Sequence, residues 1–167
     1  YSCSSLTSVV IPDSIASIGT YAFYGCTSLT EIQYNATECA DFGSSNYIFS
    51  KAGQNEEGIT VTIGANVKKI PAYMFYPYSS SYVPKIVSVI FEEGSVCKSI
   101  GSYAFAYCSS LTSVVIPDSV TEIGSWAFSS CDSLTEIQYN ATECADFGSS
   151  NGIFYNAGQN GEGITVT

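Results

Sequence analysis

Cysteine is the most reactive residue type in this sequence, and the chain contains seven of them. An odd number of cysteines cannot pair completely within one chain. The sequence has no histidine, and no two cysteines have the C-x-x-C spacing. We therefore expect neither a zinc site nor a nucleophilic Cys–His pair.

The seven cysteines occupy two positions of a repeating pattern, described below, and we expect both positions to face inward. A free cysteine at such a position behaves as a small hydrophobic side chain. Stacked repeats bring equivalent Cα atoms to about 5 Å, a distance that a disulfide can span. Two pairs, Cys3–Cys26 and Cys108–Cys131, could therefore be bridged, or all four residues could be free thiols.

The chain is acidic: it has five lysines, no arginine and fifteen Asp and Glu residues, which gives a net charge of −10. Binding to nucleic-acid phosphates needs clustered cations, so we expect no nucleic-acid partner. The acidic pairs Glu56-Glu57 and Glu92-Glu93 lack EF-hand spacing, and no G-x-S-x-G motif is present. We expect no catalytic residue, no metal ion and no cofactor, and we predict that the protein is not an enzyme.

Two N-glycosylation sequons occur, at Asn35-Ala36-Thr37 and at Asn140-Ala141-Thr142. Each follows a strand residue, Tyr34 or Tyr139, that is expected to point inward, so the asparagine should point outward. Asn35 and Asn140 are therefore either glycosylation sites, if the source glycosylates secreted proteins, or ordinary turn residues.

The elements that carry these residues are repeats. Residues 2–62 align without a gap on residues 107–167, and 48 of the 61 pairs are identical. A shorter period of 23 to 30 residues lies inside this block and predicts a solenoid, in which each turn buries its apolar face against the next. One phenylalanine marks each of about six units: Phe23, Phe49, Phe75, Phe105, Phe128 and Phe154.

Each unit reads as a short strand with alternating inward residues, such as Val114 and Ile116, followed by a return segment. Successive strands should pair in parallel and form a sheet on one side of the solenoid. Glycines recur at one place in the return segment, where we expect them to allow a tight turn: Gly19, Gly43, Gly101 and Gly124.

Two surfaces are candidate contact sites. Aromatic residues two positions before the unit phenylalanine should align as a ladder: Tyr21, Tyr47, Tyr73, Tyr103 and Trp126. This ladder is either packing between turns or a contact stripe for a glycan or another copy, because Tyr and Trp are enriched at interfaces. The second surface is the outward face of the sheet, where Glu31, Gln33, Glu136 and Gln138 are the candidate contact residues.

The repeat resembles a known family. Its unit LxxLxLPxxLxxIGxxAFxxCxxL is matched by Leu111, Val114, Ile116, Pro117, Val120, Ile123, Gly124, Ala127, Phe128, Cys131 and Leu134. This is the pattern of the BspA-like (Treponema-type) leucine-rich repeat, and the resemblance covers nearly the whole chain, with departures at residues 41–49, at their second copy and at residues 72–85. It implies an α/β solenoid, mostly β and loop: a right-handed leucine-rich-repeat solenoid with a parallel sheet of six or seven short strands on one face.

The resemblance also implies a secreted or surface-attached protein of a host-associated microbe with a role in adhesion. We expect one array over residues 1–167 that is extracellular and part of a longer array. No apolar run approaches the ~20 residues of a membrane span, so no membrane insertion is expected. We predict adhesion to, or recognition of, a protein or glycan of a host or neighbouring cell. The alternative is a structural subunit of a fibre or surface layer, in which copies or further repeats stack end to end, because neither end shows a polar cap.

Overall fold

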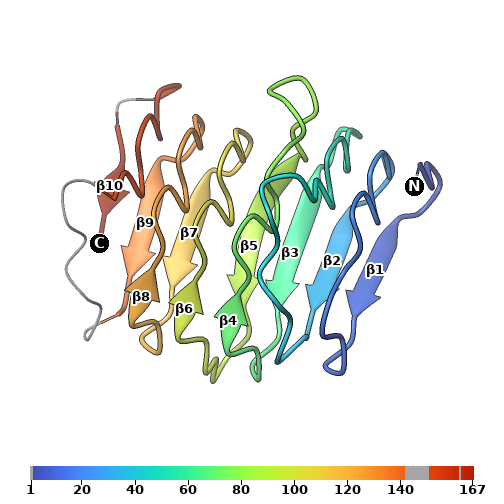
Figure 1. Cartoon of the computed structure of the whole chain (residues 1–167). Helices are drawn as coiled ribbons and strands as arrows, with labels where there is room; N and C mark the ends of the chain where they lie inside the picture. The colour runs from blue at the N-terminus through green and yellow to red at the C-terminus, as the bar shows by residue number, and fades with distance from the viewer. Residues whose placement is uncertain (1, 142–150, 162) are drawn as a thin grey trace.

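The computed structural model describes residues 2–141, 151–161 and 163–167, and within these residues the chain forms strands and loops without any helix (Figure 1). The strands are β1 (Ser8–Ile11), β2 (Glu31–Tyr34), β3 (Ile59–Ile63), β4 (Lys69–Ile70), β5 (Ile86–Phe91), β6 (Ser99–Ile100), β7 (Ser113–Ile116), β8 (Glu122–Ile123), β9 (Glu136–Tyr139) and β10 (Thr165–Val166).

Seven of these strands form one sheet in the order β1-β2-β3-β5-β7-β9-β10, and all of its pairs are parallel. The register places equivalent repeat residues side by side, as in Val9 beside Ile32 and Ile32 beside Val61. Along β3 the side chains alternate between buried and half-buried, which is the expected inward–outward alternation. The predicted leucine-rich-repeat solenoid with a parallel sheet on one face is confirmed.

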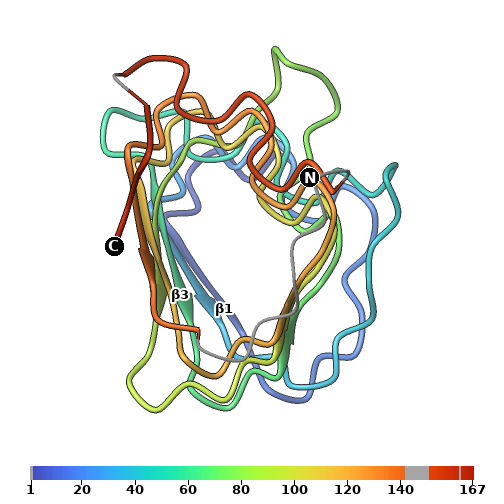
Figure 2. The ribbon, with the colours of Figure 1, turned by 90° about the vertical axis from the view of Figure 1, so that its left-hand side faces the viewer.

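A second, three-stranded sheet of β4, β6 and β8 lies on the other side of the solenoid. Viewed along the solenoid axis, the chain encloses its interior between β1 and β3 on one side and the return segments on the other (Figure 2). The strands β4, β6 and β8 have only two residues each, and the second residue is buried: Ile70, Ile100 or Ile123. Two residues are too few to show a period of two, so the sequence pattern predicts only a return segment here.

The unit phenylalanines form one continuous stack through the interior. Successive ring centroids are 5.1, 5.2, 5.4, 5.2 and 5.5 Å apart from Phe23 to Phe154. The four inner rings are completely buried, whereas Phe23 and Phe154, in the outermost turns, are partly buried.

The recurrence of these glycines at one place in the repeat has a different cause from the expected one. A hydrogen-bonded turn begins at each of Gly19, Gly43, Gly101 and Gly124, but none of them has a left-handed φ, so the turn itself does not require glycine. A Cβ atom at Gly101 would lie 2.4 Å from the backbone nitrogen of Ala72, and one at Gly124 would lie 2.4 Å from that of Ser102. These two glycines instead let the backbone of one turn approach the backbone of the turn before it.

This difference predicts unequal effects of alanine at equivalent positions. Gly101→Ala and Gly124→Ala should each lower the free energy of unfolding by about 1–3 kcal/mol, because a backbone has to move to admit the new methyl group. Gly19→Ala is the matched control, since a Cβ there meets no atom within 4 Å, and its effect should stay within about 0.5 kcal/mol. Urea unfolding followed by circular dichroism measures all three, and equal effects would contradict the close-approach explanation.

Candidate functional site

The outward face of the large sheet places the four predicted contact residues in different environments. Glu31, Glu136 and Gln138 are exposed. Gln33 is half-buried, and its Nε2 donates to Asn35 Oδ1 at 2.9 Å and to Glu92 Oε1 at 3.1 Å. Glu92 also accepts the backbone N–H of Ala65 at 3.0 Å. Gln33 therefore belongs to a hydrogen-bond network that ties β2 to the turns after β3 and β5.

The two sequon asparagines also differ. Asn35 is half-buried, and a Cβ at Gly64 in the next turn would lie 2.3 Å from its Oδ1. Asn140 is exposed and accepts a hydrogen bond from Gln138 at 3.3 Å. Thr142, the third residue of the second sequon, lies outside the described residues.

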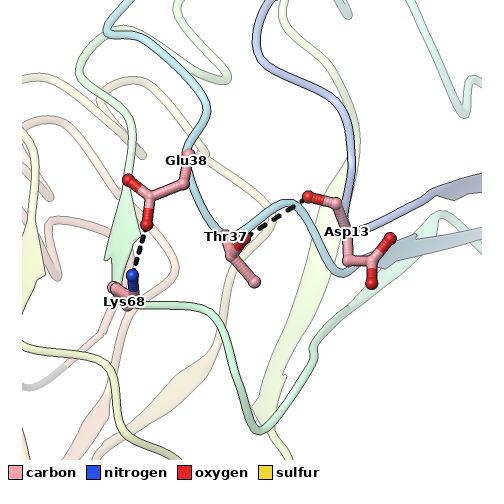
Figure 3. Close-up of polar contacts among 4 residues, drawn as sticks. All are labelled: Asp13, Thr37, Glu38 and Lys68. Atoms are coloured by element: carbon pink, nitrogen blue, oxygen red, sulfur yellow. Dashed lines mark hydrogen bonds and ion pairs between the residues drawn. The ribbon is translucent and has the colours of Figure 1, made fainter.

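The residues after Asn35 are attached to the turns on both sides. The hydroxyl of Thr37 donates to the carbonyl of Asp13 at 3.4 Å, and the carboxylate of Glu38 pairs with Lys68 (Figure 3). The hydrogen bond and the positive charge of Lys68 lower the pKa of Glu38. Both side chains of the ion pair are largely exposed, so this contact positions the turn and adds little stability.

Two neighbouring hollows follow the carboxyl ends of the sheet strands, and we call them together the carboxyl-end groove. The larger has a volume of about 590 Å³ and is lined by Val89, Ile90, Phe91, Glu92, Glu93, Gly94, Ser95, Val115, Pro117, Asp118 and Asn140. The smaller, of about 350 Å³, shares Glu92 and is otherwise lined by Val10, Pro12, Asp13, Asn35, Gly64, Ala65 and Asn66. No lysine lines either hollow, whereas four carboxylates do.

The exposed aliphatic side chains of this groove lie on the outward sheet face that the sequence predicts as a contact surface, but they are not among its four candidate contact residues. Ile90 and Val115 lie on adjacent strands, because Val89 pairs with Val114, and they are 48% and 45% exposed. The sequence does indicate this apolar surface, since β5 and β7 carry apolar residues at outward as well as inward positions. A strand covered on one face only should alternate apolar with polar residues.

The aromatic ladder forms, but it is divided in two. Tyr73 stacks on Tyr103 with centroids 5.0 Å apart, and Tyr103 stacks on Trp126 at 6.1 Å. Tyr21 packs on Tyr47 at 5.6 Å. Among the described ring pairs none joins Tyr47 to Tyr73, because Tyr78 of the loop between β4 and β5 packs edge-on against Tyr47 at 5.2 Å.

All five ladder residues have a left-handed backbone, with φ between 45° and 62°. This conformation costs an L-residue about 1–2 kcal/mol, and the ring contacts help to offset that cost. The equivalent residue in the sixth unit is Gly152, which adopts the same conformation at φ 56° and packs under the ring of Trp126.

The described cysteines are all free thiols, and five of the six are buried. Cys3 is exposed, contrary to the expected inward position, because it lies in the first turn and only the following turn covers it. Burial, and then the neighbouring thiol of Cys3, raises the pKa of Cys26; burial, and then the neighbouring thiol of Cys131, raises the pKa of Cys108. Both possible disulfides remain predictions, and Cys144 lies outside the described residues.

Burial raises the pKa of the inner thiols. It raises the pKa of Cys131 to about 12, raises that of Cys97 to about 11, and raises that of Cys108 well above its ordinary value. The described residues contain no group of three Cys, Asp or Glu side chains that could hold a metal ion. They also contain no helix of the length and hydropathy that crossing a bilayer requires.

Comparison with known proteins agrees with this geometry. A family model described as "BspA type Leucine rich repeat region" matches residues 1–92 and 78–159, in six copies. The chain therefore belongs to the BspA-type leucine-rich-repeat family. A comparison with curated proteins finds no match.

Several solved structures are similar to the chain. A leucine-rich cell surface protein from Faecalibacterium prausnitzii is 29% identical over 82% of this chain and 40% of its own, with a TM-score of 0.47. A leucine-rich repeat protein from Eubacterium ventriosum is 25% identical over 81% of this chain and 37% of its own, with a TM-score of 0.46. The pneumococcal vaccine antigen PcpA is 20% identical over 83% of this chain and 29% of its own, with a TM-score of 0.45. The chain thus spans 40% or less of the length of each.

The thiol environments predict selective alkylation. In the reduced protein at pH 8, iodoacetamide should modify Cys3, whereas Cys108 and Cys131 should react only after unfolding in guanidinium. The reason is that the thiolate is the nucleophile, and a pKa raised by burial leaves little thiolate at this pH. Peptide mass spectrometry of samples alkylated with and without guanidinium measures the fraction of each cysteine that is modified. Equal modification of Cys3 and Cys131 in the folded protein would contradict the buried placement.

Proposed function

We propose that this chain is a non-enzymatic recognition module of an extracellular, cell-surface protein, and that the carboxyl-end groove binds a basic segment of a partner protein. The observation that carries the proposal is the exposure of Ile90 and Val115, side by side, in a hollow whose edge carries Glu92, Glu93 and Asp118.

The apolar floor supports a binding role because burying it would be favourable. A solvent-exposed Ile–Val pair on a flat sheet gains nothing from its own fold, and burial of apolar surface is worth about 25 cal/mol per Å². Phe91 and Pro117 extend this floor toward the ends of β5 and β7. Clustered apolar surface with a polar border is typical of a protein contact site.

The charge supports a basic partner. Glu92, Glu93 and Asp118 surround one hollow and Asp13 lies in the other, without a lysine in either lining. The net charge of −10 adds a long-range attraction for cations. Lysine and arginine fit both features, because their methylene stems can cover Ile90 and Val115 while their charged ends meet the carboxylates.

The extracellular location is carried over from the BspA-type family and agrees with the composition, which is rich in neutral polar and aromatic residues and only 12% charged. Asn35 and Asn140 both line the carboxyl-end groove. If these sequons carry glycans in the source cell, the glycans would cover the groove and exclude the partner.

A peptide-binding measurement tests this function. Fluorescence anisotropy should detect saturable binding of a labelled ten-residue peptide that combines lysine, leucine and glycine, but not of the same peptide with glutamate in place of lysine. The double variant Ile90→Ser/Val115→Ser should bind about tenfold more weakly, because two apolar contacts are lost. Val96→Ser is the matched control, because Val96 is 44% exposed but lies outside both hollows.

Binding should also weaken as the salt concentration rises from 0.05 to 0.5 M, since the contact depends on exposed charges. Equal binding of both peptides, or unchanged binding by the double variant, would refute the proposal. Absence of binding together with ordered end-to-end assemblies in sedimentation and electron microscopy would favour the alternative, a structural subunit of a fibre or surface layer.

A further inference from the structure

We propose that a second site, at the opposite end of the strands, binds an uncharged glycan. The site is a hollow of about 450 Å³, which we call the tyrosine hollow; it is lined by Ser44, Tyr47, Tyr76, Pro77, Tyr78, Ser79, Ser80 and Tyr107. Five of its residues belong to the loop between β4 and β5, which projects at the amino ends of the sheet strands (Figure 1). The proposal is independent of the carboxyl-end groove, because the two sites share no residue.

The hollow exists because the aromatic ladder is divided. Tyr47 and Tyr78 form one wall, with ring centroids 5.2 Å apart. Tyr76 and Tyr107 form another, 5.8 Å apart, and Tyr76 also packs edge-on against Tyr73 at 5.4 Å. The unit that contains this loop has 30 residues from Phe75 to Phe105, the longest spacing in the chain, so its extra residues build the hollow.

The loop is fixed before any ligand arrives. The backbone N–H of Tyr78 donates to Ser50 Oγ at 2.8 Å, and Ser50 is only 1% exposed. The N–H of Lys51 donates to the carbonyl of Tyr82 at 2.7 Å, and the ring of Tyr82 contacts that of Tyr78 at 5.8 Å. A site held in this way loses little conformational entropy on binding, which favours affinity for a small ligand.

The backbone at two of the rings is strained. Tyr47 has φ 45° and Tyr107 has φ 65°, in the left-handed region that L-residues rarely adopt. The cost is about 1–2 kcal/mol at each. For Tyr47 the ring contacts with Tyr21 and Tyr78 offset it. Among the described residues, the ring of Tyr107 contacts only that of Tyr76, and Tyr107 is exposed, so packing offsets less of the cost there.

The chemistry of the lining fits a sugar. A sugar ring has a face of C–H groups, which packs on an aromatic face, and a border of hydroxyl groups that donate and accept hydrogen bonds. The tyrosine hollow offers both features, with four rings and seven hydroxyl groups. Among the described residues, no hydrogen bond engages the hydroxyls of Tyr47, Tyr76, Tyr78 or Tyr107, so all four can bind a ligand. Burial and the neighbouring tyrosines raise the pKa of Tyr76, which keeps its phenol protonated as a donor.

The absence of charge in the lining selects against ionic ligands. No lysine or acidic residue lines the hollow. The chain carries a net charge of −10, which repels sialylated and sulfated glycans. The volume lies within the range of about 300–1,000 Å³ that is typical of small-molecule sites. The ligand class that remains is a neutral oligosaccharide.

A glycan array tests the inference. The labelled protein is applied to an array that carries neutral oligosaccharides and their sialylated counterparts, and the best neutral ligand is then titrated by calorimetry. We expect binding to neutral members and weaker binding to each sialylated counterpart. The variant Tyr78→Ser/Tyr107→Ser should bind about tenfold more weakly, because two aromatic contacts are lost.

Tyr155→Ser is the matched control. Tyr155 is 55% exposed, close to the 56% of Tyr78, and packs on Trp126 outside the hollow, so its loss should leave glycan binding unchanged. Circular dichroism melting shows whether each variant keeps the fold. The inference is overturned if no neutral glycan binds, if sialylated glycans bind as well as neutral ones, or if the control weakens binding as much as the double variant.

Discussion

The stack of phenylalanine rings sets the distance between neighbouring turns, and the rest of the structure depends on that distance. Ring centroids from Phe23 to Phe154 are 5.1 to 5.5 Å apart, close to the spacing of about 4.8 Å between hydrogen-bonded strands. The sheet and the aromatic core therefore impose the same repeat on opposite sides of one interior. Gly101 and Gly124 maintain it where the return segments come into backbone contact.

Because the spacing is constant, equivalent residues of successive repeats lie side by side and form a column along the solenoid. Residues that share a phase share an environment, which is why five aromatic residues adopt the same left-handed φ and why Gly152 adopts it in the sixth unit. It also explains why the apolar outward residues of β5 and β7 become neighbours: the register that aligns Val89 with Val114 brings Ile90 beside Val115. A surface feature of one turn is extended by the next.

The tyrosine hollow lies where a column is interrupted. The register between β3 and β5 shifts at Ile59 and Thr60, at the amino ends of these strands, whereas the carboxyl-end groove follows their carboxyl ends, where the pairing is regular. The aromatic ladder is interrupted by the loop that carries Tyr76 and Tyr78, and the tyrosine hollow lies at that break. At the tyrosine hollow, a departure from the repeat therefore replaces the regular column with a concave surface.

The sequence alone determined the architecture of this protein, because alternation of period two and one phenylalanine per 23 to 30 residues are local patterns with one compatible packing. It located the strands of the large sheet and the inward placement of residues such as Ile32 and Ile116. The tertiary structure decided what depends on contacts between turns: the two-residue strands such as β6, the close approach at Gly101, the exposure of Cys3, and the shapes of both hollows. These features join residues 23 or more positions apart, whose distance is fixed only when the turns stack.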